Sequence, residues 1–295
     1  MDLFMGKAMF DPKKLLPIPV LILLLSVAVS YMSWSAGTVP MGVDLQGGTV
    51  IIIPTGQPVE GLEDIIRQDF ALEAKSSVIK DFSGAIKQQE IVINKKGLSS
   101  EEEKGIKERI LREFESQGIE HGAIFVESVS GFFSEMFLRE SIKAVVFAFL
   151  FMAVVVFVKF KSFIPSFAVV LSAFADIIET VAAMIVLGIE LSKGSIVALL
   201  LLIGYSVDTD IMLTSRLLKQ RGRKGLDETI RDAMYTGLTM SGTTIAAMII
   251  LLLVSTSELL DSIATVIIIG LLFDLLNTWV TNLSLLKMYV EGGGR

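Results

Sequence analysis

Acidic side chains lie inside stretches of the chain that are otherwise apolar enough for lipid: Asp176, Glu179, Asp208, Asp210 and Asp274. An ionised carboxylate near the middle of a helix in lipid costs roughly 2.5 to 3.5 kcal/mol, so such groups are expected to face protein or water. Burial and a neighbouring acid both favour the neutral form, so an acid placed there can gain and lose a proton inside a membrane. This pattern indicates a proton or ion relay, for which we select Asp176, Asp208, Asp210 and Asp274.

The spacing of the acids decides which of them can cooperate on regular helices. Asp176 and Glu179 are three residues apart and share a face. Asp208 and Asp210 are two residues apart and diverge by roughly 200°, so one helix presents them to different neighbours, and the sequence leaves open which one faces the relay. Arg216 lies roughly 12 Å further along the axis than Asp208, either as a relay residue or as a positive anchor at the membrane surface. The alternative role of the acids is interhelical hydrogen bonding.

Composition identifies a membrane protein and argues against an enzyme. Hydrophobic residues make up 52% of the chain, and the mean hydropathy is +0.67, well beyond a soluble domain. With no cysteine and the single histidine His121, thiolate and histidine-rich metal sites are excluded. The chain has no GxxxxGK[ST] loop for nucleotide phosphates. We therefore expect no catalysis, no cofactor, no metal and no nucleic-acid partner.

Apolar runs long enough to cross a hydrocarbon core of about 30 Å predict six transmembrane helices. They cover residues 15–34, 142–158, 164–187, 195–215, 236–254 and 263–286. Basic residues gather before the first run and in two alternate loops: Lys7, Lys13, Lys14, Lys159, Lys161, Arg216, Lys219, Arg221, Arg223, Lys224 and Arg231. In the two loops on the opposite side, Lys193 is the only basic residue. The positive-inside rule then predicts a cytoplasmic N-terminus over residues 1–14, a first span that is retained and not cleaved as a signal peptide, and a short cytoplasmic C-terminus.

The segment 35–138 has the composition of a water-soluble domain and is predicted to lie outside the membrane. Its patterns predict a strand, a helix, two strands, a helix and a strand, at residues 47–54, 59–72, 76–82, 86–94, 99–115 and 121–130. The second helix has a capping box predicted at Ser100 and Glu103 and an apolar stripe of Ile106, Ile110 and Phe114. This order indicates an α+β ferredoxin-like extracytoplasmic domain, followed by a five-helix region over 139–295.

Two motifs carry a resemblance to a known family. MGVDLQGGT, with Gly42, Asp44, Gly47 and Gly48, resembles the signature G-[IV]-D-[LF]-x-G-G-T that follows the first span in the SecD/SecF family. IGYSVDTDIMLTSR resembles the fourth-span signature of the SecF branch of that family, through Gly204, Tyr205, Ser206 and Arg216. The layout of six spans with a domain after the first matches from end to end. A single separate chain of this form resembles the archaeal branch, within the resistance-nodulation-division (RND) superfamily.

The resemblance implies one RND-type half that serves as an auxiliary subunit of the Sec protein translocase in the cell membrane. It would use the transmembrane proton or sodium gradient to promote late stages of protein export. The implied partners are SecD as a separate chain, the Sec translocation channel, the emerging unfolded polypeptide and membrane lipids. In an ungapped alignment the family's fourth-span acid falls on Thr209, between Asp208 and Asp210, and its third-span acid matches Asp176.

Two other classes of protein also use acids within the membrane. An RND-type transporter half that moves lipids or small molecules is the main alternative, although such transporters typically have a larger outer region or a duplicated set of spans. An intramembrane aspartyl protease requires paired GxGD and YD motifs, and neither surrounds the acids of this chain. Export therefore remains the favoured function.

Overall fold

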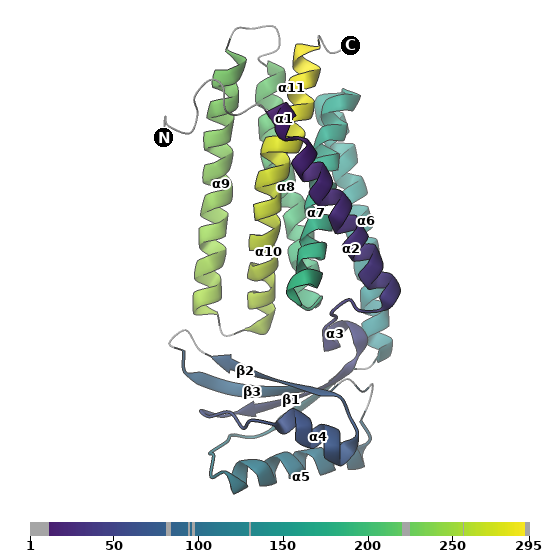
Figure 1. The fold of residues 1–295 in the computed structure, drawn as a ribbon, viewed down its shortest axis with the longest axis vertical. Coiled ribbons are helices and arrows are strands. Elements are labelled where there is room, and N and C mark those ends of the chain that lie inside the picture. The colour runs from purple at the N-terminus through teal and green to yellow at the C-terminus, as the bar shows by residue number, and fades with distance from the viewer. Residues whose placement is uncertain are drawn as a thin grey trace.

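The computed structural model describes residues 12–80, 84–93, 95, 98–129, 131–219, 225–255 and 257–292. A helical bundle and a small sheet domain lie end to end (Figure 1). Both α1 (Pro12–Leu15) and α11 (Leu283–Glu291) lie at the end of the bundle away from the sheet domain. Among the basic residues used to predict orientation, those outside the described residues are Lys7, Arg221, Arg223 and Lys224.

Within the described part of the chain, six helical segments are long and apolar enough to cross a membrane. The first five are α2 (Pro17–Ala36), α6 (Gly131–Phe160), α7 (Phe163–Leu187), α8 (Lys193–Lys219) and α9 (Leu226–Val254). The sixth consists of α10 (Glu258–Leu276), the π-helix η1 (Asn277–Asn282) and α11. The six predicted runs therefore all correspond to helices.

Several of these helices extend beyond the apolar runs that predicted them. Helix α6 begins at Gly131, inside the segment 35–138 that the sequence assigned to the outer domain. Its polar first turns are stabilised by pairs at helical spacing, such as Arg139 with Glu135 at 3.0 Å. An apolar run marks only the part of a helix that suits lipid, so it underestimates the length of the helix.

The centre of the bundle is formed by α7 and α8, packed against α10 (Figure 1). About half of the apolar stretch of α7 and of α8 is buried, whereas α2, α6 and α9 are largely exposed along theirs. Close packing of α10 on α8 relies on Gly270, because a Cβ there would lie 2.3 Å from a methyl carbon of Leu202. The spans that bear the membrane acids are thus more buried than the other three described spans.

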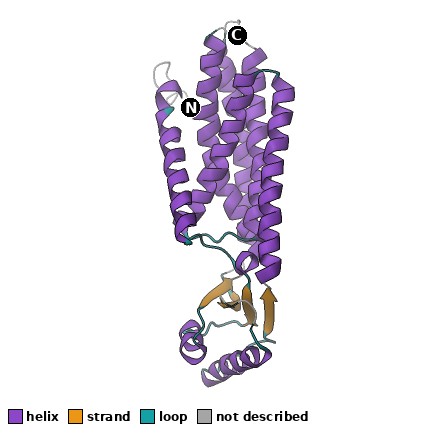
Figure 2. Ribbon diagram, turned by 90° about the vertical axis from the view of Figure 1, so that its right-hand side faces the viewer, coloured by secondary structure: helices purple, strands orange, loops and turns teal. Residues whose placement is uncertain are grey.

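The sheet domain contains a four-stranded antiparallel sheet in the order β2-β3-β1-β4. Its strands are β1 (Gly48–Pro54), β2 (Ala74–Lys80), β3 (Ile86–Ile93) and β4 (Phe125–Val129). Helices α4 (Leu62–Phe70) and α5 (Ser100–Ser116) lie on the face away from the bundle (Figure 2). Alternate strand residues meet the predicted stripe of α5 in one core: Ile51, Ile53, Ile91, Ile93, Ile106, Ile110 and Phe114. The arrangement is compatible with the predicted ferredoxin-like unit.

Helix α5 begins with a capping box one residue earlier than predicted. Ser99 Oγ accepts a hydrogen bond from the Glu102 backbone N–H at 3.2 Å, and Glu102 Oε2 accepts one from the Ser99 N–H at 2.9 Å. Lys95 Nζ lies 2.5 Å from Glu102 Oε1, and this bond, with those from Ser99, lowers the pKa of Glu102 to about 2. The prediction of Ser100 and Glu103 was wrong because both pairs fit the S-x-x-E spacing.

Replacing the true capping residue should loosen the start of α5. Ser99→Ala removes the acceptor for a helix N–H and should cost about 1 kcal/mol, which makes amide exchange in the first turn roughly fivefold faster. Ser100→Ala is the matched control, since its side chain lies one position past the cap. Hydrogen exchange followed by mass spectrometry measures both variants; equal exchange rates in the two would contradict this assignment of the cap.

Candidate functional site

A buried cluster of polar side chains occupies the region where α7, α8 and the sixth span meet. Its four acids, here called the acid cluster, are Asp176, Glu179, Asp210 and Asp274, all fully buried in the protein. The uncharged members that surround them are also buried: Ser206, Asn277, Thr278 and Asn282. Polar groups are costly away from water unless they find partners, so the contacts among these residues decide what the site can do.

The π-helix η1 accounts for how one span can contact both acid-bearing helices. A π-helix has wider turns than an α-helix, is rare, and often lies at functional sites. Here it brings Asn277 into contact with acids of α7, and Thr278 and Asn282 into contact with the acid of α8. The six residues NTWVTN are all buried, so the widened turn faces the interior of the bundle.

The α7 side of the cluster is held by neutral donors. Asn277 Nδ2 donates to Asp176 Oδ1 at 2.9 Å and to Glu179 Oε2 at 2.7 Å. Ser206 Oγ of α8 donates to Asp176 Oδ2 at 2.5 Å. Thr281 Oγ1 donates to Asn277 Oδ1 at 3.1 Å, which orients the amide with its nitrogen toward the acids. Asp176 therefore joins α7 to both α8 and the sixth span.

The α8 side of the cluster centres on Asp210. Asn282 Nδ2 donates to Asp210 Oδ1 at 2.7 Å. The hydroxyl oxygen of Thr278 lies 2.9 Å from Asp210 Oδ1 and 3.1 Å from Asp274 Oδ1. A hydroxyl carries a single proton, so Thr278 can donate to only one of these carboxyls. The second contact becomes a hydrogen bond when the other carboxyl itself carries a proton.

No cation in the described part of the chain neutralises the acid cluster. No ion pair among the described residues includes any of its four acids, and their hydrogen-bond donors are amides and hydroxyls. One oxygen each of Glu179, Asp210 and Asp274 has no hydrogen-bond partner in the described part of the chain. No metal-binding group of three or more His, Cys, Asp or Glu residues occurs there either. Such a site is suited to taking up protons, because protonation removes unpaired charge from a buried place.

Two of the predicted relay residues lie away from the acid cluster. Asp208 is exposed on the surface of α8, whereas Asp210, two residues later, is buried among the partners described above. Arg216 donates from Nη1 to the backbone oxygen of Asp232 at 3.1 Å, and so joins the ends of α8 and α9. Thr209, at the position of the family's acid, is buried and bonds to the Tyr205 carbonyl of its own helix at 3.5 Å.

The signature residues divide between the two parts of the molecule. Ser206 belongs to the site through Asp176, while Gly204 and Tyr205 lie on the exposed face of α8. Of the first signature, Gly42, Asp44 and Gly47 lie between α2 and β1, and Gly48 is the first residue of β1. Gly47 has φ of +78°, a backbone conformation that favours glycine, at the turn into β1.

Asn277, Thr278 and Asn282 were not among the relay residues selected from the sequence. A usable signal was present, because NTWVTN places four amide or hydroxyl side chains in six positions of an apolar span. Polar residues within a membrane helix commonly face the bundle interior. The sequence shows no sign that the turn is a π-helix.

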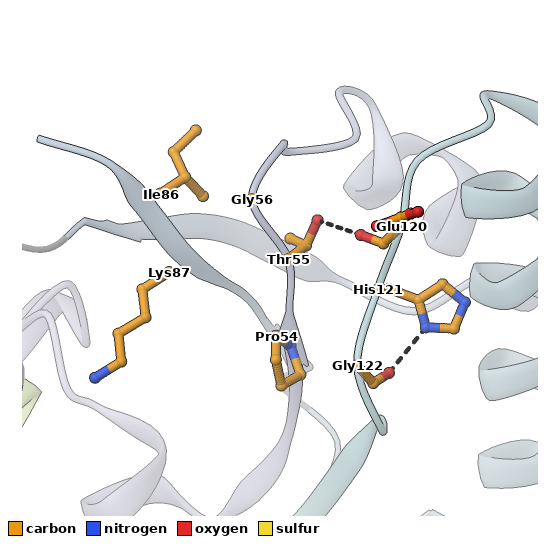
Figure 3. A pocket seen from close by; sticks show the side chains of 8 residues that line it. All are labelled: Pro54, Thr55, Gly56, Ile86, Lys87, Glu120, His121 and Gly122. Carbon is orange, nitrogen blue, oxygen red and sulfur yellow. Dashed lines mark hydrogen bonds between the residues drawn. The ribbon is translucent and has the colours of Figure 1, made fainter.

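A pocket lies on the sheet domain, away from the acid cluster. It has a volume of about 500 Å³ and is lined by Pro54, Thr55, Gly56, Ile86, Lys87, Glu120, His121 and Gly122 (Figure 3). His121 Nδ1 lies 2.8 Å from the carbonyl oxygen of Gly122, and its ring packs edge-on against Phe114. These contacts are those of a structural histidine at the end of the sheet.

The fold and site together define a multi-pass membrane protein with a buried acid cluster in its bundle and a sheet domain after its first span. The model of the family "Protein export membrane protein SecD/SecF, C-terminal" matches residues 108–292. The chain belongs to the SecD/SecF family of protein-export membrane proteins.

Its relatives cover nearly the whole chain. The protein-export membrane protein SecF of Methanolacinia petrolearia is 39% identical over 302 residues, covering 99% of this chain and 100% of the relative. The SecF of Methanocaldococcus jannaschii is 40% identical over 285 residues, covering 95% and 96%. The crystal structure of SecDF, a translocon-associated membrane protein from Thermus thermophilus, matches with a TM-score of 0.75 at 19% identity. It covers 94% of this chain, which spans only 38% of that longer one, so this likeness concerns the fold.

The packing of α9 against the π-helix η1 can be tested at Gly237. A Cβ on Gly237 would lie 2.4 Å from Trp279 Cζ2 of η1, so Gly237→Ala should displace the indole and cost about 1 to 3 kcal/mol. Gly242→Ala, on the same helix with nothing within 4 Å of its Cβ, is the matched control and should be close to neutral. Thermal unfolding of the detergent-solubilised variants measures the difference; two equally stable variants would contradict the tight packing of α9 on η1.

Proposed function

We propose that this chain is an auxiliary subunit of the Sec protein translocase that uses the transmembrane proton gradient, or a sodium gradient, to promote late stages of export. The observation that carries the proposal is the acid cluster, buried in the bundle of a SecD/SecF family member with no cation among the described residues to neutralise it. Its partners in this function are SecD as a separate chain, the translocation channel and the emerging unfolded polypeptide. Membrane lipids surround the exposed apolar faces of α2, α6 and α9.

Asp210 is the acid to which we assign the moving proton. It is buried, and it contacts the π-helix through both Thr278 and Asn282. Adding a proton to Asp210 removes a buried charge and changes a hydrogen-bond acceptor into a donor. Its neighbours must then reorient, which repacks α8 against the sixth span. Asp176, bonded to Ser206 of α8 and Asn277 of the sixth span, is placed to respond on α7.

The basic residues support a proposed orientation of the chain in the membrane. Arg216 and Lys219 end α8 at the side where α1 and α11 lie, opposite the sheet domain. With that side cytoplasmic, the sheet domain lies outside, where an exported polypeptide emerges. In this arrangement the domain binds the emerging chain and hinders its return.

Removing the proton-carrying acid should abolish the stimulation of export. Asp210→Asn keeps the size of the side chain but cannot release a proton, so export should fall to the level of cells that lack the chain. Asp208→Asn is the matched control, because Asp208 is exposed on the same helix and should leave export largely intact. Secretion of a signal-sequence reporter, at equal membrane levels of each variant, measures the effect. Normal export by Asp210→Asn would refute the proposed relay.

The proposed orientation can be tested because the chain has no cysteine. Lys104→Cys places a thiol on the exposed surface of α5, and Lys219→Cys places one at the opposite end of the molecule. A membrane-impermeant maleimide should label Lys104→Cys in intact cells and Lys219→Cys only after lysis. The reverse labelling pattern would place the sheet domain in the cytoplasm and contradict this orientation.

A further inference from the structure

The segment between α2 and the sheet domain contacts the loop that joins α7 to α8. This segment, residues 40–46, contains the first signature residues Gly42 and Asp44 and the short helix α3 (Val43–Gln46). Its backbone forms a parallel β-bridge with the loop at Met41 and Leu191. Gly42 N–H donates to the Leu191 carbonyl at 2.8 Å, and Leu191 N–H donates to the Pro40 carbonyl at 2.7 Å. We refer to this contact as the clamp.

Two ion pairs accompany the backbone contact of the clamp, and in the second pair the acid and the base have exchanged sides. Asp44 Oδ1 lies 3.0 Å from Lys193 Nζ at the start of α8. Lys75 Nζ of β2 lies 2.9 Å from Glu190 Oε1 of the loop. The segment 40–46 thus contributes an acid and β2 contributes a base, and the bundle contributes the complementary base and acid. Such a pattern favours a single docked position, because a displaced domain would lose one pair or bring like charges together.

The loop held by the clamp is rigidly connected to both helices. Helix α7 ends at Leu187 and is capped by Gly188 with φ of +68°, and the Ile189 N–H donates to the Met184 carbonyl at 2.9 Å. Ser192 and Ser195 exchange hydrogen bonds at the start of α8, and Ser195 Oγ donates to the Glu190 carbonyl at 3.0 Å. The loop is therefore bonded to the end of α7 and to the start of α8. When these helix ends shift, the loop shifts with them.

The same two helices bear the acids of the site. Asp176 and Glu179 are on α7, and Asp210 lies seventeen residues after Lys193 on α8, or about 26 Å along its axis. A helix of this length acts as a lever, so a change of tilt at Asp210 shifts its end at Lys193. The contact that receives this shift is the clamp.

We propose that the signature segment is a coupling clamp, in which Asp44 and Lys193, with Lys75 and Glu190, transmit rearrangement of the acid cluster to the position of the sheet domain. This assignment rests on the proposed function. It gives the first signature the role of positioning the sheet domain, at a distance from the acid cluster that takes up protons. Both ion pairs are substantially exposed, so each contributes little and is weakened by salt. Such a clamp can release and re-form during each cycle.

A disulfide across the clamp tests the coupling directly. Met41→Cys with Leu191→Cys places two cysteines at a β-bridge in a chain that otherwise has none. In native membranes the yield of this disulfide should differ by up to about fivefold between the otherwise unchanged chain and its Asp210→Asn variant. Oxidised protein should also lose export and regain it on reduction. Full export by the cross-linked protein, or an identical yield in both backgrounds, would overturn the clamp.

Charge exchange tests the ion pair and separates the clamp from the relay. Asp44→Lys and Lys193→Asp should each reduce export, and the double variant should restore it. Exchanging Glu140 and Lys143, an exposed pair 2.8 Å apart within α6, is the control and should have no effect. If Asp210→Asn abolishes export but the single charge changes do not reduce it, the clamp is refuted and the proposed function stands. If Asp210→Asn leaves export normal, the proposed function itself fails.

Discussion

The bundle is organised around carboxyl groups that, within the described residues, are buried without a cation. The described side chains that bond to Asp176, Glu179, Asp210 and Asp274 are amides and hydroxyls, not lysine or arginine. A basic residue would fix the acids in their ionised state and stabilise one packing of the helices. Neutral donors leave the energies of the protonated and ionised states closer together, which suits the proton exchange that we propose for this site.

The widened turn of the sixth span is the backbone feature that makes this arrangement possible. Donors from one segment reach acids on two different helices: Asn277 contacts α7, and Asn282 contacts α8. Gly237 of α9 leaves room behind the turn for the indole of Trp279. The neutral donors and the backbone conformation that presents them therefore depend on each other.

The six spans could be predicted because a helix that crosses the hydrocarbon core needs a minimum number of consecutive apolar residues. Such a run is visible in the sequence itself. The strands and helices of the sheet domain could be predicted because residues such as Ile106, Ile110 and Phe114 repeat with the period of a helix buried on one side. The divergence of Asp208 and Asp210 was also foreseeable from helix geometry. Which of the two is buried was not, because that depends on the face of α8 that α7 and the sixth span cover. The π-helix escaped prediction for a related reason, since spacing arguments assume a regular α-helix.

The exposed position of Asp208 has an energetic consequence for the chain on its own. A carboxylate on the outside of a membrane helix costs roughly 2.5 to 3.5 kcal/mol when lipid covers it. That cost disappears once a polar neighbour covers this face of α8. A solitary copy is therefore the higher-energy species, and the amount of folded chain in a cell should follow the supply of whatever assembles with it.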